Sequence, residues 1–173
     1  HHTGYVGNMK AVKYGTLMKT KPEFVVEKAV NTLKSFDVPY EVHVFSAHRT
    51  PAEAKEFSMN ARKNGFGAII AAAGMAAHLA GAIAANTTLP VVGIPINCGK
   101  LDGVDALLST VMMPSGIPVA TVAINGGANA ALLAAQIIAV EDKDLADKLD
   151  KMRKDAADVV LKKDADVMSK LNS

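Results

Sequence analysis

The stretch Ala68-Ile69-Ile70-Ala71-Ala72-Ala73 is apolar at every position. A strand of this composition is buried on both faces, as in the middle of a parallel sheet that is covered by helices. The run Pro90-Val91-Val92-Gly93-Ile94-Pro95 has the same character and predicts a second central strand. These two stretches favour an α/β fold.

Apolar runs of strand length alternate with helical stretches on both sides of these two segments. Strands are expected over residues 10–15, 40–45, 67–73, 89–95 and 117–124, and helices over 23–35, 51–63, 76–85, 103–111 and 128–140. Right-handed crossovers then give a three-layer αβα fold, in which a doubly wound, parallel five-stranded sheet is flavodoxin-like. Residues 9–173 are expected to form one domain with an extra C-terminal helix.

Two helical segments have more apolar surface than a monomer needs. Residues 128–140 are apolar nearly all round, which predicts a helix buried between subunits. The C-terminal segment has one apolar face, formed by Leu145, Leu149, Met152, Ala156, Val159 and Val160. Either a neighbouring subunit or the parent sheet could cover that face, and together the two segments predict a homo-oligomer.

Composition excludes several classes of function. The net charge is +2 with no sustained basic run, so no nucleic-acid partner is expected, and no apolar run is long enough to predict a membrane span. The single cysteine, Cys98, cannot form an intramolecular disulfide, which favours the cytoplasm. Aromatic residues make up only 5% of the chain, so its core must consist of small aliphatic residues and is expected to pack closely.

Residues 1–8 resemble the remnant of an expression tag, with Met9 as the expected native start. The two histidines at positions 1 and 2 are therefore left out of the chemistry. Three histidines remain, namely His43, His48 and His78.

The segment Ser46-Ala47-His48-Arg49-Thr50-Pro51 joins a predicted strand to a predicted helix. Thr50 is expected to be the N-cap, with Pro51 at the first helical position and Glu53 completing a capping box. Free backbone N–H groups, the helix dipole and the Arg49 guanidinium would then favour a bound phosphate or carboxylate. The alternative is that His48 and Arg49 merely decorate a surface loop.

Other polar residues follow the remaining strands, and ligands bind at these carboxyl ends in open parallel sheets. His48 and His78 are expected to face a common crevice there. The small residues around Ala73 and Gly74 predict a narrow, apolar pocket beside them. His43 lies within a predicted strand and is expected to be structural, whereas for His78 the structural and functional interpretations both stay open.

No cofactor or metal is predicted. The sequence contains no GxGxxG fingerprint, no Walker loop and no HExxH pattern. Cys98 is interpreted as a small loop residue rather than a nucleophile.

Six motifs in register resemble the bacterial 5-(carboxyamino)imidazole ribonucleotide mutase family of purine biosynthesis, often called PurE. They are Ser46-Ala-His-Arg-Thr-Pro51, Ala76-Ala-His-Leu-Ala-Gly81, Leu89-Pro-Val-Val-Gly-Ile-Pro95, Asp102-Gly-Val-Asp105, Met113-Pro-Ser-Gly-Ile-Pro118 and Asn129-Ala-Ala-Leu-Leu-Ala-Ala135. The resemblance implies a three-layer α/β fold, a homo-octamer with active sites near subunit contacts, and no cofactor. It also implies transfer of a carboxylate from the exocyclic nitrogen of an imidazole ribonucleotide to a ring carbon.

The resemblance assigns roles to individual residues. It implies that His48 is the catalytic proton shuttle, that Arg49 holds the substrate phosphate, and that the ring or backbone of His78 orients the base. The other implied substrate-binding residues of these loops are Ser46, Ala47, Ala73, Gly74, Met75, Ala76 and Leu79.

The first loop departs from the family pattern, which is Gly-Ser-x-Ser-Asp. Here Gly15 and Thr16 match its start, but Lys19 stands where the aspartate would fall. All three are kept as substrate-binding residues, although a lysine cannot accept hydrogen bonds from ribose hydroxyls. Altered nucleotide binding and an unreliable stretch of recorded sequence are both open explanations.

Two alternatives to a mutase remain. One is a direct carboxylase of 5-aminoimidazole ribonucleotide, a related class that tends to carry lysine in place of Arg49. The other is a catalytically impaired nucleotide-binding homologue, suggested by the altered first loop.

Overall fold

The computed structural model describes residues 8–11, 22–99 and 101–172. Within these ranges, five parallel strands form one sheet in the order β2-β1-β3-β4-β5. The strands are β1 (Asn8–Ala11), β2 (Glu41–His43), β3 (Ile69–Gly74), β4 (Val91–Ile96) and β5 (Ala120–Thr121). This order is that of a flavodoxin-like sheet, so the predicted fold is confirmed.

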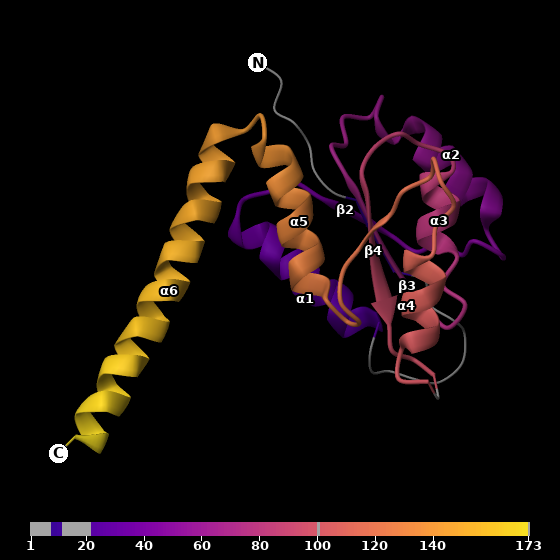
Figure 1. Ribbon diagram of the computed structural model, residues 1–173. Helices are drawn as coiled ribbons and strands as arrows, with labels where there is room; N and C mark the ends of the chain where they lie inside the picture. Colours follow the sequence, from indigo (N-terminus) through magenta and orange to yellow (C-terminus); the bar gives the residue numbers. More distant parts are fainter. Residues whose placement is uncertain (1–7, 12–21, 100, 173) are drawn as a thin grey trace.

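Helices cover both faces of the sheet, and this makes three layers (Figure 1). The helices are α1 (Pro22–Ser35), α2 (Pro51–Ala61), α3 (Leu79–Ala84), α4 (Val104–Val111), α5 (Gly127–Ala139) and α6 (Lys143–Leu171). Helices α1 and α5 lie on one face and α2, α3 and α4 on the other, whereas α6 extends well beyond the body. None of the helices in the described ranges is both long and apolar enough to cross a membrane.

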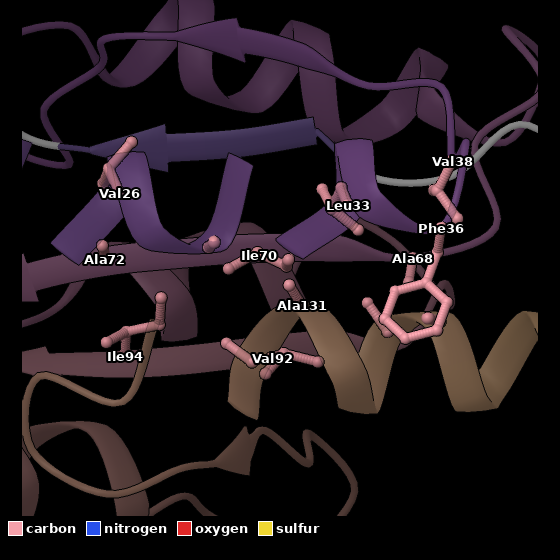
Figure 2. Close-up of a cluster of buried hydrophobic side chains, with 14 of the residues drawn as sticks. Val26, Leu33, Phe36, Val38, Ala68, Ile70, Ala72, Val92, Ile94 and Ala131 are labelled. Atoms are coloured by element: carbon pink, nitrogen blue, oxygen red, sulfur yellow. The ribbon is translucent and has the colours of Figure 1, made fainter. Parts of the chain in front are cut away.

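Strand β3 is buried along its whole length and serves both halves of the core. Ile70 and Ala72 pack in the cluster under α1 and α5, and part of this cluster is drawn in Figure 2. Ile69, Ala71 and Ala73 point to the opposite face, toward α3. The alternation follows from the two-residue period of a strand. Both isoleucines stand at the start of the strand, and only alanine and glycine follow them.

Small residues bring backbones and helices close together, as the composition predicts. A Cβ atom at Gly127 would lie 2.1 Å from the carbonyl oxygen of Val25, so α5 reaches α1 only because the side chain is absent. A Cβ at Gly93 would lie 2.4 Å from Cγ2 of Thr110, and this brings α4 against β4. Larger residues at either glycine would force the layers apart.

The start of α6 packs on its own chain. The Asp142 side chain caps the helix by accepting a hydrogen bond of 2.9 Å from the Leu145 N–H. Leu145 and Leu149 are buried with α1 and α5, and Lys148 Nζ lies 2.7 Å from Asp37 Oδ2. The start of the predicted apolar face, and part of the apolar surface of α5, are therefore covered within the same chain.

No described residue of the chain covers the end of that face. Ala156, Val159 and Val160 are exposed in the part of α6 that extends away from the sheet. This leaves apolar surface for which the chain itself offers no contact among the described residues.

Several predicted element boundaries are wrong. Strands β2 and β5 are shorter than expected, because each is an edge strand that pairs with a single neighbour. Strand β1 begins at Asn8, inside the predicted tag remnant, and the predicted strand over 10–15 lies partly outside the described residues. Helix α3 begins at Leu79 rather than residue 76, because Met75 has a φ of +55° and a turn follows it.

Candidate active site

The loop after β2 is organised around the Ser46 side chain, which is buried. Its Oγ accepts hydrogen bonds from the backbone N–H groups of His48 and Arg49, at 3.3 and 3.1 Å. Thr50 closes the loop, because its hydroxyl accepts a bond of 2.8 Å from Ser46 N–H and donates one of 3.2 Å to the Ser46 carbonyl. The loop is thus fixed by side-chain hydrogen bonds to its own backbone.

These bonds correct two predictions. Thr50 occupies the N-cap position of α2 and Pro51 begins the helix, but the Thr50 side chain makes no capping bond and no capping box forms with Glu53. The N–H groups of His48 and Arg49 are also not free for an anion, because Ser46 already accepts from them. Any anion at this junction would therefore depend on the exposed Arg49 side chain and the helix dipole.

The loop after β3 carries the second histidine. Gly74 ends the strand, Met75 takes a left-handed conformation, and a tight turn joins Ala76 to His78. The sequence places His78 in the first turn of a helix over residues 76–85, and this prediction is wrong. His78 is instead the N-cap residue of α3. This position directs its exposed ring across the end of the sheet.

The two loops bring His48 and His78 into direct contact. Nε2 of His48 lies 3.2 Å from Nδ1 of His78, and the two rings meet edge to face with centroids 5.1 Å apart. A hydrogen bond at this distance requires one nitrogen to carry a proton and the other to present a lone pair. The common crevice predicted for the two histidines is confirmed, and the pair can hold and pass a proton.

A small pocket opens beside the histidine pair. Its volume is about 10 Å³, which is close to the least that one water molecule requires. It is lined by Ala47, His48, Ala73, Gly74, Ala76, His78 and Leu79, and every one of them is a predicted site residue. The narrow, largely apolar pocket expected from the alanines is therefore present.

A much larger cavity, of about 970 Å³, lies at the opposite edge of the sheet. Residues 89–91 at the start of β4 and Pro118 before β5 contribute to its lining. No predicted site residue lines it. Because parallel sheets present their functional groups at the carboxyl ends of the strands, we assign the candidate site to the smaller pocket.

The structure adds Cys98 to the surroundings of the candidate site. From the sequence, this residue was interpreted only as a small loop residue. It follows β4, and a Cβ at Gly74 would lie 2.0 Å from its sulfur. Partial burial raises the pKa of the Cys98 thiol, a hydrogen bond from the Met75 backbone opposes that rise, and the Asp105 carboxylate adds to it. The signal for this contact is the register between β3 and β4, in which Gly74 pairs with Ile96.

His43 is structural, as predicted. Its Nε2 lies 3.1 Å from Glu41 Oε2, and its ring stacks on Phe45 with 5.6 Å between centroids. Phe57 of α2 packs against the same ring. These contacts hold β2 to α2 and keep His43 outside the pocket.

Some of the remaining predicted residues lie near the pocket, and others lie outside the described residues. Ser46 lies beneath the β2 loop, and Met75 is exposed beside Gly74. Gly15, Thr16 and Lys19 of the first loop lie outside the described residues. No group of three or more His, Cys, Asp or Glu side chains that could hold a metal ion occurs in residues 8–11, 22–99 and 101–172.

The family model and the curated relatives that match this chain belong to the same family of enzymes. The family model described as AIR carboxylase matches residues 19–159. N5-carboxyaminoimidazole ribonucleotide mutase of Mycobacterium leprae is 46% identical over 90% of this chain and 91% of its own. The mutases of Saccharolobus solfataricus and Haemophilus influenzae are each 48% identical, over 86% and 88% of this chain and 95% and 94% of theirs.

Solved structures agree in fold. Treponema denticola PurE aligns with a TM-score of 0.78 at 25% identity, over 93% of this chain and 96% of that one. A variant of PurE2 from the same organism gives a TM-score of 0.80 at 24% identity, over 93% and 97%. Given the match of the family model to most of its length, the chain belongs to the AIR carboxylase family.

Proposed function

We propose that this protein is an N5-carboxyaminoimidazole ribonucleotide mutase of purine biosynthesis, an isomerase that moves a carboxyl group within its substrate. Relatives that are 46–48% identical over nearly their whole length support this activity. The structural observation that carries the proposal is the contact of 3.2 Å between His48 and His78 beside an alanine-rich pocket.

The reaction needs a proton shuttle but no net proton. The carbamate C–N bond breaks, its electron pair stays on the exocyclic nitrogen, and that nitrogen takes a proton as carbon dioxide leaves. The ring carbon then forms a bond to the carbon of the gas and loses its own proton to the base. We assign both transfers to His48, because an imidazole can donate and accept protons near neutral pH.

His78 is proposed to orient this base. Its Nδ1 faces Nε2 of His48, so one shared proton links the two rings. Such a contact would fix the plane of the His48 ring. It would also let the histidine pair hold the proton between the two transfers.

The pocket is proposed to hold the released gas. Ala47, Ala73 and Ala76 line it and leave room for little more than one small molecule. Confinement beside the ring carbon turns recapture into an effectively intramolecular step, since the gas does not escape into solution. The small volume also leaves little space for competing water.

Substrate binding is proposed to involve the loops around this pocket. Arg49 would hold the ribonucleotide phosphate through its guanidinium fork, and Ser46 and Ala47 would border the substrate. Gly74, Met75 and Leu79 would bound it on the side of β3. Gly15, Thr16 and Lys19 are retained as contacts of the phosphate and ribose on the basis of the family resemblance.

We also propose a homo-octamer in the cytoplasm. The family resemblance supports the octamer, and the exposed Val159 and Val160 on α6 supply apolar surface for subunit contacts. The single cysteine favours a reducing compartment.

The test is to incubate the purified protein with the carboxyamino ribonucleotide and, separately, with 5-aminoimidazole ribonucleotide. Both incubations contain labelled bicarbonate. We expect turnover of the first without label in the product, because the gas stays trapped. Turnover of the second substrate, with label incorporated, would instead identify a direct carboxylase. Binding of either ribonucleotide without turnover would identify an impaired homologue.

A further inference from the structure

Two loops of the candidate site leave the sheet side by side. Gly74 at the end of β3 pairs with Ile96 at the end of β4, so the residues that follow each strand lie next to one another. Met75 comes directly after Gly74, and Cys98 lies two residues beyond Ile96. The pocket residues that follow β3 therefore lie against the loop that follows β4.

The Cys98 thiol fits the β3 loop in two ways. Its sulfur occupies the space that any side chain on Gly74 would need. A Cβ atom on Gly74 would lie only 2.0 Å from this sulfur. The Met75 backbone N–H faces the same sulfur and lowers the pKa of the thiol. The sulfur thus contacts two consecutive residues of the pocket loop.

Met75 needs such support because its backbone is in an unfavourable conformation. Its φ of +55° lies in the left-handed region, which a residue with a side chain seldom adopts. This conformation turns the chain from the end of β3 toward His78, three residues later. Relaxation at Met75 would therefore change where His78 lies relative to His48.

The β4 loop is itself held from its other side. The Asn97 N–H donates a hydrogen bond of 3.0 Å to Oδ1 of Asn125, in the loop after β5. Asn125 also has a left-handed backbone, with a φ of +59°, and its N–H bonds to the Pro95 carbonyl. Cys98 thus follows a fixed residue, and the loops after β3, β4 and β5 are linked in series.

We propose that Cys98 is a positioning residue, whose thiol holds the Gly74–Met75 turn in the conformation that places His78 against His48. Its catalytic consequence rests on the proposed mutase activity. The thiol takes no part in the chemistry and contacts neither reacting group.

The experiment combines Cys98→Ala and Cys98→Ser with Met75→Gly in a double-mutant cycle. Alanine removes the hydrogen-bond acceptor, whereas serine keeps one. Glycine at position 75 adopts the left-handed conformation without strain and so should not need the thiol. Ser35→Ala, on the exposed end of α1, is the control for loss of a small polar group away from the site.

We expect Cys98→Ala to lower kcat/KM by about three- to tenfold, mainly through kcat, because it would weaken the contact between His78 and His48 by about the worth of one hydrogen bond. Cys98→Ser should keep most of the activity. Cys98→Ala made in the Met75→Gly protein should have little further effect. The NMR signals of the His48 and His78 rings should shift in Cys98→Ala and return toward those of Met75→Gly in the double variant.

Unchanged kcat and unchanged histidine signals in Cys98→Ala would overturn the proposal, and so would additive effects in the cycle. A loss of thermal stability without either change would also overturn it, since it would leave the thiol a purely structural role. If the unmodified protein lacks mutase turnover, the proposed function fails, but the histidine signals still decide the positioning role.

Discussion

Nε2 of His48 lies 3.2 Å from Nδ1 of His78, although their loops follow strands β2 and β3, which β1 separates in the sheet. The two loops must therefore approach one another beyond the end of β1. Strand order reverses beside β1, and ligands of doubly wound sheets bind at such a point. The topology of the chain thus explains how two distant motifs form one proton-handling pair.

Replacement of His48 by asparagine should abolish most turnover. We expect kcat to fall by about 10²- to 10⁴-fold, the usual contribution of a general acid–base group. The side chain is exposed, so the fold should survive, which circular dichroism can check. His43→Gln is the matched control and should keep its activity, and equal activity of the two variants would contradict the assignment of His48.

Replacement of His78 separates positioning from simple packing. Asparagine can place a polar atom near the position of Nδ1, whereas leucine cannot. We expect His78→Leu to lower kcat by about tenfold, in line with the loss of one hydrogen bond. His78→Asn should recover part of that loss, and two equally impaired variants would argue against an orienting role.

Gly74 should not tolerate a methyl group. Gly74→Ala would press a Cβ against the Cys98 sulfur, and we expect a loss of about 1–3 kcal/mol in the free energy of unfolding. Urea denaturation measures this change. Gly99→Ala is the control, because a Cβ there would meet Asp105 only at an ordinary contact of 3.6 Å, and its stability should change little.

The Cys98 thiol should react slowly at neutral pH. Cys98 is exposed, but partial desolvation raises the pKa of its thiol and outweighs the lowering by the Met75 backbone, and the Asp105 carboxylate adds to the rise, so the reactive thiolate is scarcer than in a free cysteine. We expect the rate of modification by a disulfide reagent to be several-fold lower in the folded chain than in urea at pH 8, and to increase as the pH is raised. Because the chain contains one cysteine, the measured rate belongs to this site alone.

The exposed end of α6 should govern assembly. Val159 and Val160 are 68% and 66% exposed, so their joint replacement by lysine should alter the free energy of unfolding by only about 0.5 kcal/mol each. We expect light scattering to report a smaller assembly for this variant, because two charges would oppose burial in a subunit contact. Ser169→Lys adds a charge farther along the helix and should leave the mass unchanged.

The sequence was sufficient to predict the sheet, its strand order and most of the pocket. Uniformly apolar strands such as β3 identify the centre of a parallel sheet, and the residues after such strands must gather at one edge. Edge strands were less predictable, because β5 is limited to the two residues that pair with β4.

Local conformation was the weakest part of the prediction. Thr50 matches a capping pattern, but its hydroxyl bonds the backbone of Ser46, four residues earlier, and this competes with capping of α2. The late start of α3 depends on the left-handed backbone at Met75, where the sequence has no glycine. The support from Cys98 depends on strand register, which spacing along the chain does not specify.

Strand β3 must fill the core at one end and leave a pocket open at the other. Its bulky isoleucines at one end pack in the core, whereas Ala73 and Gly74 at the other end line the pocket beside the histidines. A larger residue at Ala73 or Gly74 would therefore fill the pocket, and at Gly74 it would also press on Cys98 in the β4 loop. Attempts to redesign this enzyme for a bulkier substrate should begin in the loops around the pocket and leave the end of this strand unchanged.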